Sequence, residues 1–116
     1  MTIRIVSDRI SQEDLKRLAE ETYKEMVKAV VDVQRKILAV GGELHADAEA
    51  LLLDGGSRQE DLWGINLYPD KPEAARIEYS SLINIRPRQG NSSLEVRDAA
   101  LRQEIKSVVD QRVHWG

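Results

Sequence analysis

The chain contains no cysteine and no phenylalanine, and aromatic residues make up only 4% of its 116 residues. Without cysteine, disulfides, thiolate metal sites and cysteine nucleophiles are excluded. With so few aromatic side chains, the core must be built mainly from leucine, isoleucine and valine. Trp63 and Tyr68 are the aromatic residues that we expect to matter.

Long apolar runs and an excess of positive charge are also missing. No stretch approaches the roughly 20 apolar residues of a membrane span, and no apolar targeting run begins the chain. The 20 acidic residues outnumber the 17 lysines and arginines, so the net charge is −3. That balance argues against general nucleic-acid binding and membrane-surface binding. We expect one cytoplasmic domain spanning residues 1–116.

Hydrophobic periodicity predicts an α+β fold. The expected strands are residues 2–6, 27–33, 36–41, 62–68 and 77–86. The expected helices are residues 12–25, residues 44–53, and a last helix ending near residue 113. Capping boxes at residues 11–14 (SQED) and 92–95 (SSLE) predict the first and last helix starts. Short connections favour an antiparallel or mixed sheet of about five strands, with about three helices mainly on one face.

Residues 27–41 allow two interpretations. A helical stripe that starts in the first helix can be continued from Met26 to Val40, which would make one long helix. However, four of the seven residues from 27 to 33 are valine, and β-branched residues favour strands. We prefer a hairpin that turns near Gln34 and Arg35.

Polar residues gather on one face of the last two expected strands. Period-two alternation places Asn66 on that face of one strand, and Ser80, Asn84 and Arg86 on that face of the other. A solvated sheet face is one explanation. Because asparagine is a poor strand former, directional binding of a ligand and a polar dimer interface are two others.

Two further features near these strands are unusual. Arg86 and Arg88 flank a proline and are followed by a tight-turn glycine and Asn91, which suits bidentate recognition of an anion. The alternative is that these arginines pair with the acidic segment 43–61. Gly64 follows Trp63 within an expected strand, and glycine there indicates close approach of a backbone or a ligand.

A third cluster lies at residues 43–49, which combine the one internal histidine with several carboxylates. On a helix, His45 and Glu49 are neighbours and could form an acid–base pair, whereas Asp47 points away. On an extended chain, Glu43, His45, Asp47 and Glu49 would share a face, an arrangement that suits ligands of Mg²⁺ or Mn²⁺. The simplest alternative is a helix start that carries acids because the helix dipole favours them.

Three runs resemble a known family when taken together: residues 42–49 (GELHADAE), 57–64 (SRQEDLWG) and 81–91 (SLINIRPRQGN). Over nearly its full length, the chain resembles a family of small prokaryotic proteins that is classed as a domain of unknown function. The resemblance implies a single domain and the hairpin at residues 27–41. It implies no catalytic residue, substrate or cofactor.

These observations lead to one main functional hypothesis and one alternative. We expect one pocket that binds a small anionic ligand, in which His45, helped by Glu49 or Asp47, transfers a proton if the chain is an enzyme. The ligand-binding candidates are Arg86, Arg88, Asn84, Asn66, Asn91 and Trp63. The alternative is a structural or regulatory homodimer without catalysis. The sequence identifies no cofactor and no metal site.

Overall fold

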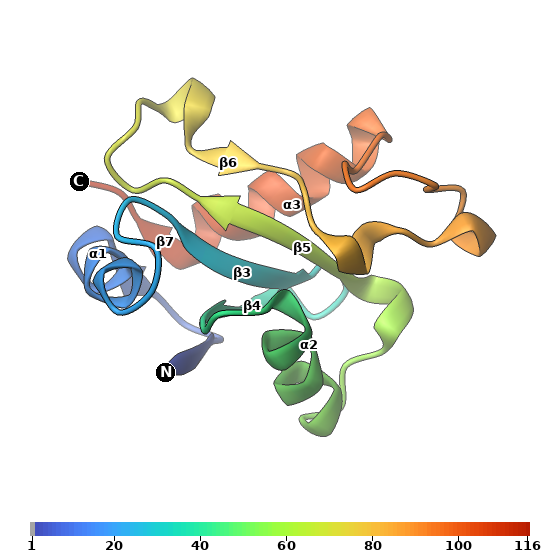
Figure 1. Cartoon of the computed structure of the whole chain (residues 1–116), viewed down its shortest axis with the longest axis horizontal. Helices are drawn as coiled ribbons and strands as arrows, with labels where there is room; N and C mark the ends of the chain where they lie inside the picture. The colour runs from blue at the N-terminus through green and yellow to red at the C-terminus, as the bar shows by residue number, and fades with distance from the viewer. Residues whose placement is uncertain (1) are drawn as a thin grey trace.

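The computed structural model describes residues 2–116, in which three α-helices accompany a five-stranded sheet (Figure 1). The strands of this sheet are β1 (Ile3–Val6), β3 (Val27–Asp32), β4 (Ile37–Gly41), β5 (Leu62–Leu67) and β6 (Ile77–Glu78). The helices are α1 (Gln12–Glu20), α2 (His45–Asp54) and α3 (Ala99–Arg112). The strand order is β1-β4-β3-β5-β6, and all neighbouring strands are antiparallel. The predicted α+β class is therefore confirmed.

The hairpin preferred for residues 27–41 is confirmed as β3 and β4. Asp32 is fully buried at the turn, where its Oδ1 accepts hydrogen bonds from the backbone N–H groups of Gln34 and Arg35, at 3.0 and 2.9 Å. Lys36 adopts a positive φ of 58° and leads into β4. The buried aspartate thus organises the turn, and the valines of β3 occupy a strand as their β-branching favours.

The two faces of the sheet are covered unequally. Alternate residues of β3 and β5 pack on the face covered by α1 and α3, which forms the larger core; they include Val27, Ala29, Val31, Trp63, Ile65 and Leu67. Helix α2 lies alone on the opposite face, where Ala48 and Leu52 pack against Val30, Ala39 and Leu62. Two of the three helices therefore share a face, as predicted. The single helix α2 leaves part of the second face uncovered.

The two ends of the chain meet in a small second sheet that the sequence did not indicate. β2 (Ile10–Ser11) pairs in parallel with β7 (Val113–His114). Ser11 also caps α1 as predicted, since its hydroxyl accepts from the Asp14 N–H at 3.1 Å. The predicted end of this helix at residue 25 is wrong: α1 ends at Glu20, and Lys24 takes a left-handed conformation with φ 68°.

The predicted strand 77–86 is wrong beyond residue 78. β6 is followed by the 3₁₀ helices η3 (Leu82–Asn84) and η4 (Pro87–Gln89). The Ser81 hydroxyl starts η3 by accepting from the Ile83 N–H at 3.2 Å. Pro87 has no N–H for a sheet neighbour, so η4 suits it better than a strand.

The predicted helix start at residues 92–95 is also wrong. The Ser93 hydroxyl accepts from the Glu95 N–H at 3.1 Å, which closes a local turn instead of a helix. Asp98 caps α3 by accepting from the N–H groups of Ala100 and Leu101, at 2.8 and 3.4 Å. A serine side chain can stabilise either a turn or a helix start, and here the turn is formed.

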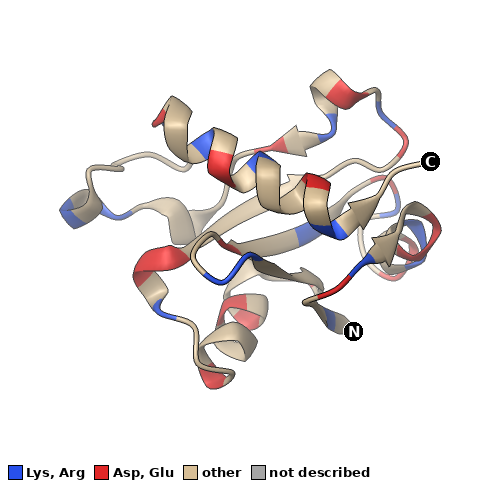
Figure 2. Cartoon of the chain, turned by 180° about the vertical axis from the view of Figure 1, so that it is seen from behind, with Lys and Arg blue, Asp and Glu red and all other residues tan. Residues whose placement is uncertain are grey.

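Charges of both signs are interspersed over the helices and loops of the described chain, as Figure 2 shows from behind. Along α3, Arg102, Lys106 and Arg112 alternate with Glu104 and Asp110. Within residues 2–116, no helix has the length and hydropathy needed to cross a membrane.

Candidate ligand pocket beside helix α2

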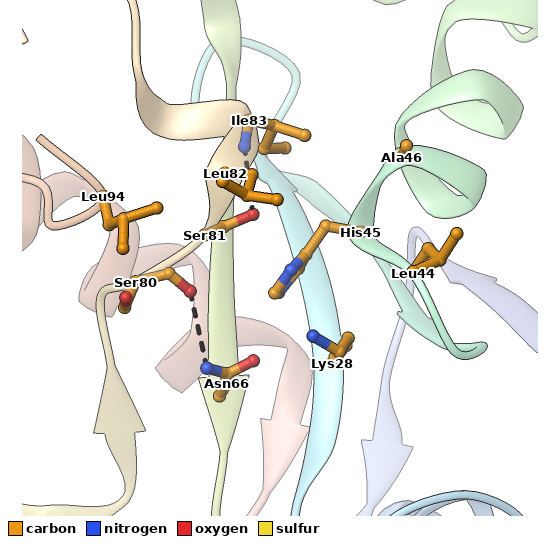
Figure 3. Close-up of a pocket in the computed structure, with 10 residues that line it drawn as sticks. All are labelled: Lys28, Leu44, His45, Ala46, Asn66, Ser80, Ser81, Leu82, Ile83 and Leu94. Carbon is orange, nitrogen blue, oxygen red and sulfur yellow. Dashed lines mark hydrogen bonds between the residues drawn. The ribbon is translucent and has the colours of Figure 1, made fainter. Parts of the chain in front are cut away.

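A pocket of about 400 Å³ lies where α2 leaves the sheet uncovered. Its floor comes from Lys28 of β3 and Asn66 of β5, which are directly opposite each other in the strand pairing. One wall is the first turn of α2, with His45, and the other is the segment with Ser80 and Ser81 (Figure 3). Besides these two serines, the pocket joins three polar side chains from different elements: Lys28, His45 and Asn66.

His45 is neutral in this environment. Only 7% of its surface is exposed, and its Nε2 lies 2.7 Å from the backbone carbonyl oxygen of Ile65. Because a carbonyl oxygen only accepts, Nε2 must carry the proton and Nδ1 must be an acceptor. Burial lowers the pKa of His45 to about 4. The Ile65 carbonyl opposes this shift, Lys28 adds a smaller lowering, and the nearby Asn66 side chain also opposes it. At neutral pH the imidazole is therefore a hydrogen-bonding group and a weak base.

Asn66 has one satisfied and one unsatisfied end. Its Nδ2 donates to Glu78 Oε1 at 2.7 Å and to the Ser80 carbonyl at 3.4 Å. Its Oδ1 is buried and has no hydrogen-bond partner within the described residues. An unpaired buried acceptor costs about 1–3 kcal/mol, so native proteins usually supply a donor. In Figure 3 this oxygen points to the side of the pocket where Lys28 and His45 lie.

Lys28 gives the pocket a positive charge. It takes part in none of the ion pairs that join residues 2–116, and its Nζ lies 5.3 Å from the centre of the Tyr23 ring. The start of α2 adds to this field, because Leu44 offers no side-chain cap to the first N–H groups of the helix. The exposed Asp47 in the same turn partly offsets it.

The structure does not pair His45 with the predicted carboxylates. Among residues 2–116, no hydrogen bond or ion pair joins His45 to Glu49 or Asp47, and no group of three potential metal ligands is present. Within the described part of the chain, Glu49 Oε2 is buried without a hydrogen-bond partner, and the charge of Glu49 opposes the lowering of the Arg86 pKa that burial causes. The Glu49 carboxylate thus acts on Arg86.

Asn84 takes the place of a strand at the edge of β5. Its Oδ1 accepts from the Gly64 N–H at 2.8 Å, and its Nδ2 donates to the carbonyls of Gly64 and Leu94, at 2.9 and 3.1 Å. The fully buried Asn84 side chain therefore makes hydrogen bonds to the part of the β5 backbone that β6 is too short to reach. The close approach expected at Gly64 is made by Ser81, whose Cβ would lie 2.5 Å from an added Gly64 Cβ.

Arg86 and Asn91 lie in the same segment, which covers the edge of β5. The Arg86 guanidinium donates to the carbonyls of Gln59 and Leu62 and lies 3.9 Å above the ring of buried Trp63. Burial lowers the pKa of Arg86, and the charge of Glu49 opposes that effect. The buried Asn91 donates to three backbone carbonyls, including that of Asn84 at 2.8 Å. These side chains hold the 80–96 segment against the sheet.

Of the residues expected to form one pocket, four are divided between two hollows, and the others line neither of them: Asp47, Glu49, Trp63, Asn84 and Asn91. His45 and Asn66 line the pocket beside α2, whereas Arg86 and Arg88 line a separate surface hollow of about 440 Å³. Lys28 was missed, although it interrupts an apolar strand on the side that faces away from Val27 and Ala29. Leu44, Leu82 and Leu94, which also line the pocket, were not singled out either.

The fold and the pocket define an α+β protein with an antiparallel sheet, one of whose faces is only partly covered by a helix. Residues 4–112 match the family described as "Protein of unknown function (DUF5674)", so the chain belongs to this family. No curated protein and no solved structure matches the chain. The family description states no activity, so a functional proposal depends on the pocket.

Proposed function

We propose that this protein binds a small anionic ligand in the pocket formed by Lys28, His45 and Asn66. The observation that carries the proposal is the buried Oδ1 of Asn66, which has no hydrogen-bond partner among residues 2–116 and lies next to a lysine that forms no ion pair with them. A ligand with a negative charge would pair with this lysine, and a donor group on the same ligand would hydrogen-bond to the Asn66 oxygen. A volume of about 400 Å³ is within the usual range for small-molecule sites.

His45 serves this ligand as a hydrogen-bond acceptor. Its pKa of about 4 leaves little driving force for taking a proton at neutral pH. Proton transfer by His45, with Glu49 or Asp47 as its helper, is therefore a weaker proposal than binding. The homodimer alternative is weaker too, because Asn84, one of its polar face residues, already pairs with backbone inside the chain.

Titration calorimetry with acetate, at constant ionic strength in chloride, tests the proposal. Lys28→Met should weaken acetate binding about tenfold or more, because it removes the charge in the pocket. The matched control is Lys71→Met, because Lys71 also lies over a tyrosine ring, 4.0 Å from the centre of Tyr68, but outside the pocket. Equal acetate binding by the wild type and Lys28→Met would refute the proposal, as would the absence of binding.

A further inference from the structure

The polar groups of the pocket suit a ligand that carries a hydrogen-bond donor as well as a negative charge. Among residues 2–116, Asn66 Oδ1 is a buried acceptor without a hydrogen-bond partner, and Nδ1 of the Nε2-protonated His45 imidazole is a second acceptor. Lys28 and the start of α2 favour an anion at the same place. Two acceptors beside a cationic region fit a molecule that carries a carboxylate and, close to it, an O–H or N–H donor.

The mouth of the pocket is apolar. Leu44, Leu82 and Leu94 come from three separate segments, line this pocket, and are 59%, 77% and 44% exposed. Exposed leucines that cluster around polar groups indicate a binding surface, because a bound partner would remove their apolar area from water. An apolar group attached to the bound carboxylate would lie against these side chains.

We infer that the ligand is a carboxylate with a hydroxyl or amide N–H on its α-carbon and a branched apolar side chain. The inference rests on the proposed function and adds the ligand's chemical class. The carboxylate lies near Lys28 and the first turn of α2, the donor bonds to Asn66 Oδ1 or His45 Nδ1, and the side chain contacts the leucines. Two sources share this chemistry: a free 2-hydroxy or N-acyl amino acid, and the C-terminal residue of a peptide.

Calorimetry with N-acetyl-L-leucine and three truncated relatives tests each part of the ligand separately. N-acetyl-L-leucinamide lacks the carboxylate, 4-methylpentanoate lacks the donor, and N-acetylglycine lacks the apolar side chain. Each should bind about tenfold more weakly than N-acetyl-L-leucine, since each lacks one interaction that contributes roughly a factor of ten to the affinity. If a tripeptide ending in leucine binds more tightly still, the source is a peptide; if not, it is a free acid.

A surface variant tests whether the leucines at the mouth of the pocket contact the apolar side chain of the ligand. Leu82→Ser should reduce the preference for N-acetyl-L-leucine over N-acetylglycine several-fold, and it should leave the fold intact because Leu82 is so exposed. Ile85→Ser is the matched control, because Ile85 is 43% exposed but lines the other hollow. An equal loss of preference in both variants, or none in either, would refute the role of Leu82.

The outcomes separate this inference from the proposed function. If acetate, 4-methylpentanoate and N-acetyl-L-leucine bind with equal affinity and all need Lys28, the inference fails and anion binding stands. If no carboxylate binds in a manner that needs Lys28, both fail.

Discussion

The buried neutral state of His45 predicts that the protein loses stability in mild acid. In the unfolded chain the imidazole takes up a proton near its ordinary pKa of 6.5, whereas in the folded chain it resists protonation until about pH 4. Between these values the unfolded state binds more protons, so the free energy of unfolding falls as the pH falls. Above pH 6.5 the effect vanishes, and below pH 4 the loss is complete.

The expected size of this loss follows from the two pKa values. Each unit of difference corresponds to about 1.4 kcal/mol, so the full loss is about 3 kcal/mol, and about 2 kcal/mol is gone by pH 5. That is a large fraction of the stability of a small domain, which is about 5–15 kcal/mol. Lys28 lowers the pKa further, so the loss should be smaller in Lys28→Met.

Urea unfolding of the wild type and His45→Gln at pH 7.5, 6.0 and 5.0 measures the effect. Glutamine can still donate to the Ile65 carbonyl but does not titrate, and His114 and the carboxylates are common to both proteins. The wild type should lose about 2 kcal/mol relative to the variant between pH 7.5 and 5.0. A difference that stays constant over this range would refute the burial of a neutral His45.

Two further predictions concern the covered edge of β5. Gly64→Ala should destabilise the fold by about 1–3 kcal/mol, since its Cβ would meet Ser81, and adding Ser81→Gly should restore part of the loss in urea melts; failure of the second change to help would contradict the contact. Asn84→Ala should cost about 3 kcal/mol, because it leaves the N–H and C=O of Gly64 unpaired; a loss below about 1 kcal/mol would show that other groups pair this edge.

Much of the fold was predictable where side-chain periodicity and burial agree. The valines of β3, the alternation in β5 and the capping serine at residue 11 each give a local signal, and each was interpreted correctly. The segment after β6 was not predictable in this way. Its alternating pattern continues to residue 86, yet Asn84 pairs with the sheet through its side chain. Sequence periodicity does not distinguish a strand that pairs with the sheet from an irregular segment whose side chain makes the same hydrogen bonds.

The candidate site was predictable only in part, for a similar reason. His45 and Asn66 were both singled out as unusual polar residues, and the pocket contains both. Asn84 and Arg86 were singled out on the same grounds, but the Asn84 amide and both terminal nitrogens of the Arg86 guanidinium bond to the backbone of the chain itself. An uncommon polar residue in a strand indicates that a hydrogen-bonding partner exists. Whether that partner is a ligand or the protein depends on the tertiary structure.

The most direct test of the ligand pocket is a ¹H–¹⁵N NMR titration of the wild-type protein with acetate. Binding beside α2 predicts saturable shifts at residues 44–47, at Lys28 and at the side-chain amide of Asn66, with little change at Arg86 and Arg88 in the other hollow. Saturable shifts centred on Arg86 and Arg88, or none that saturate, would contradict the account.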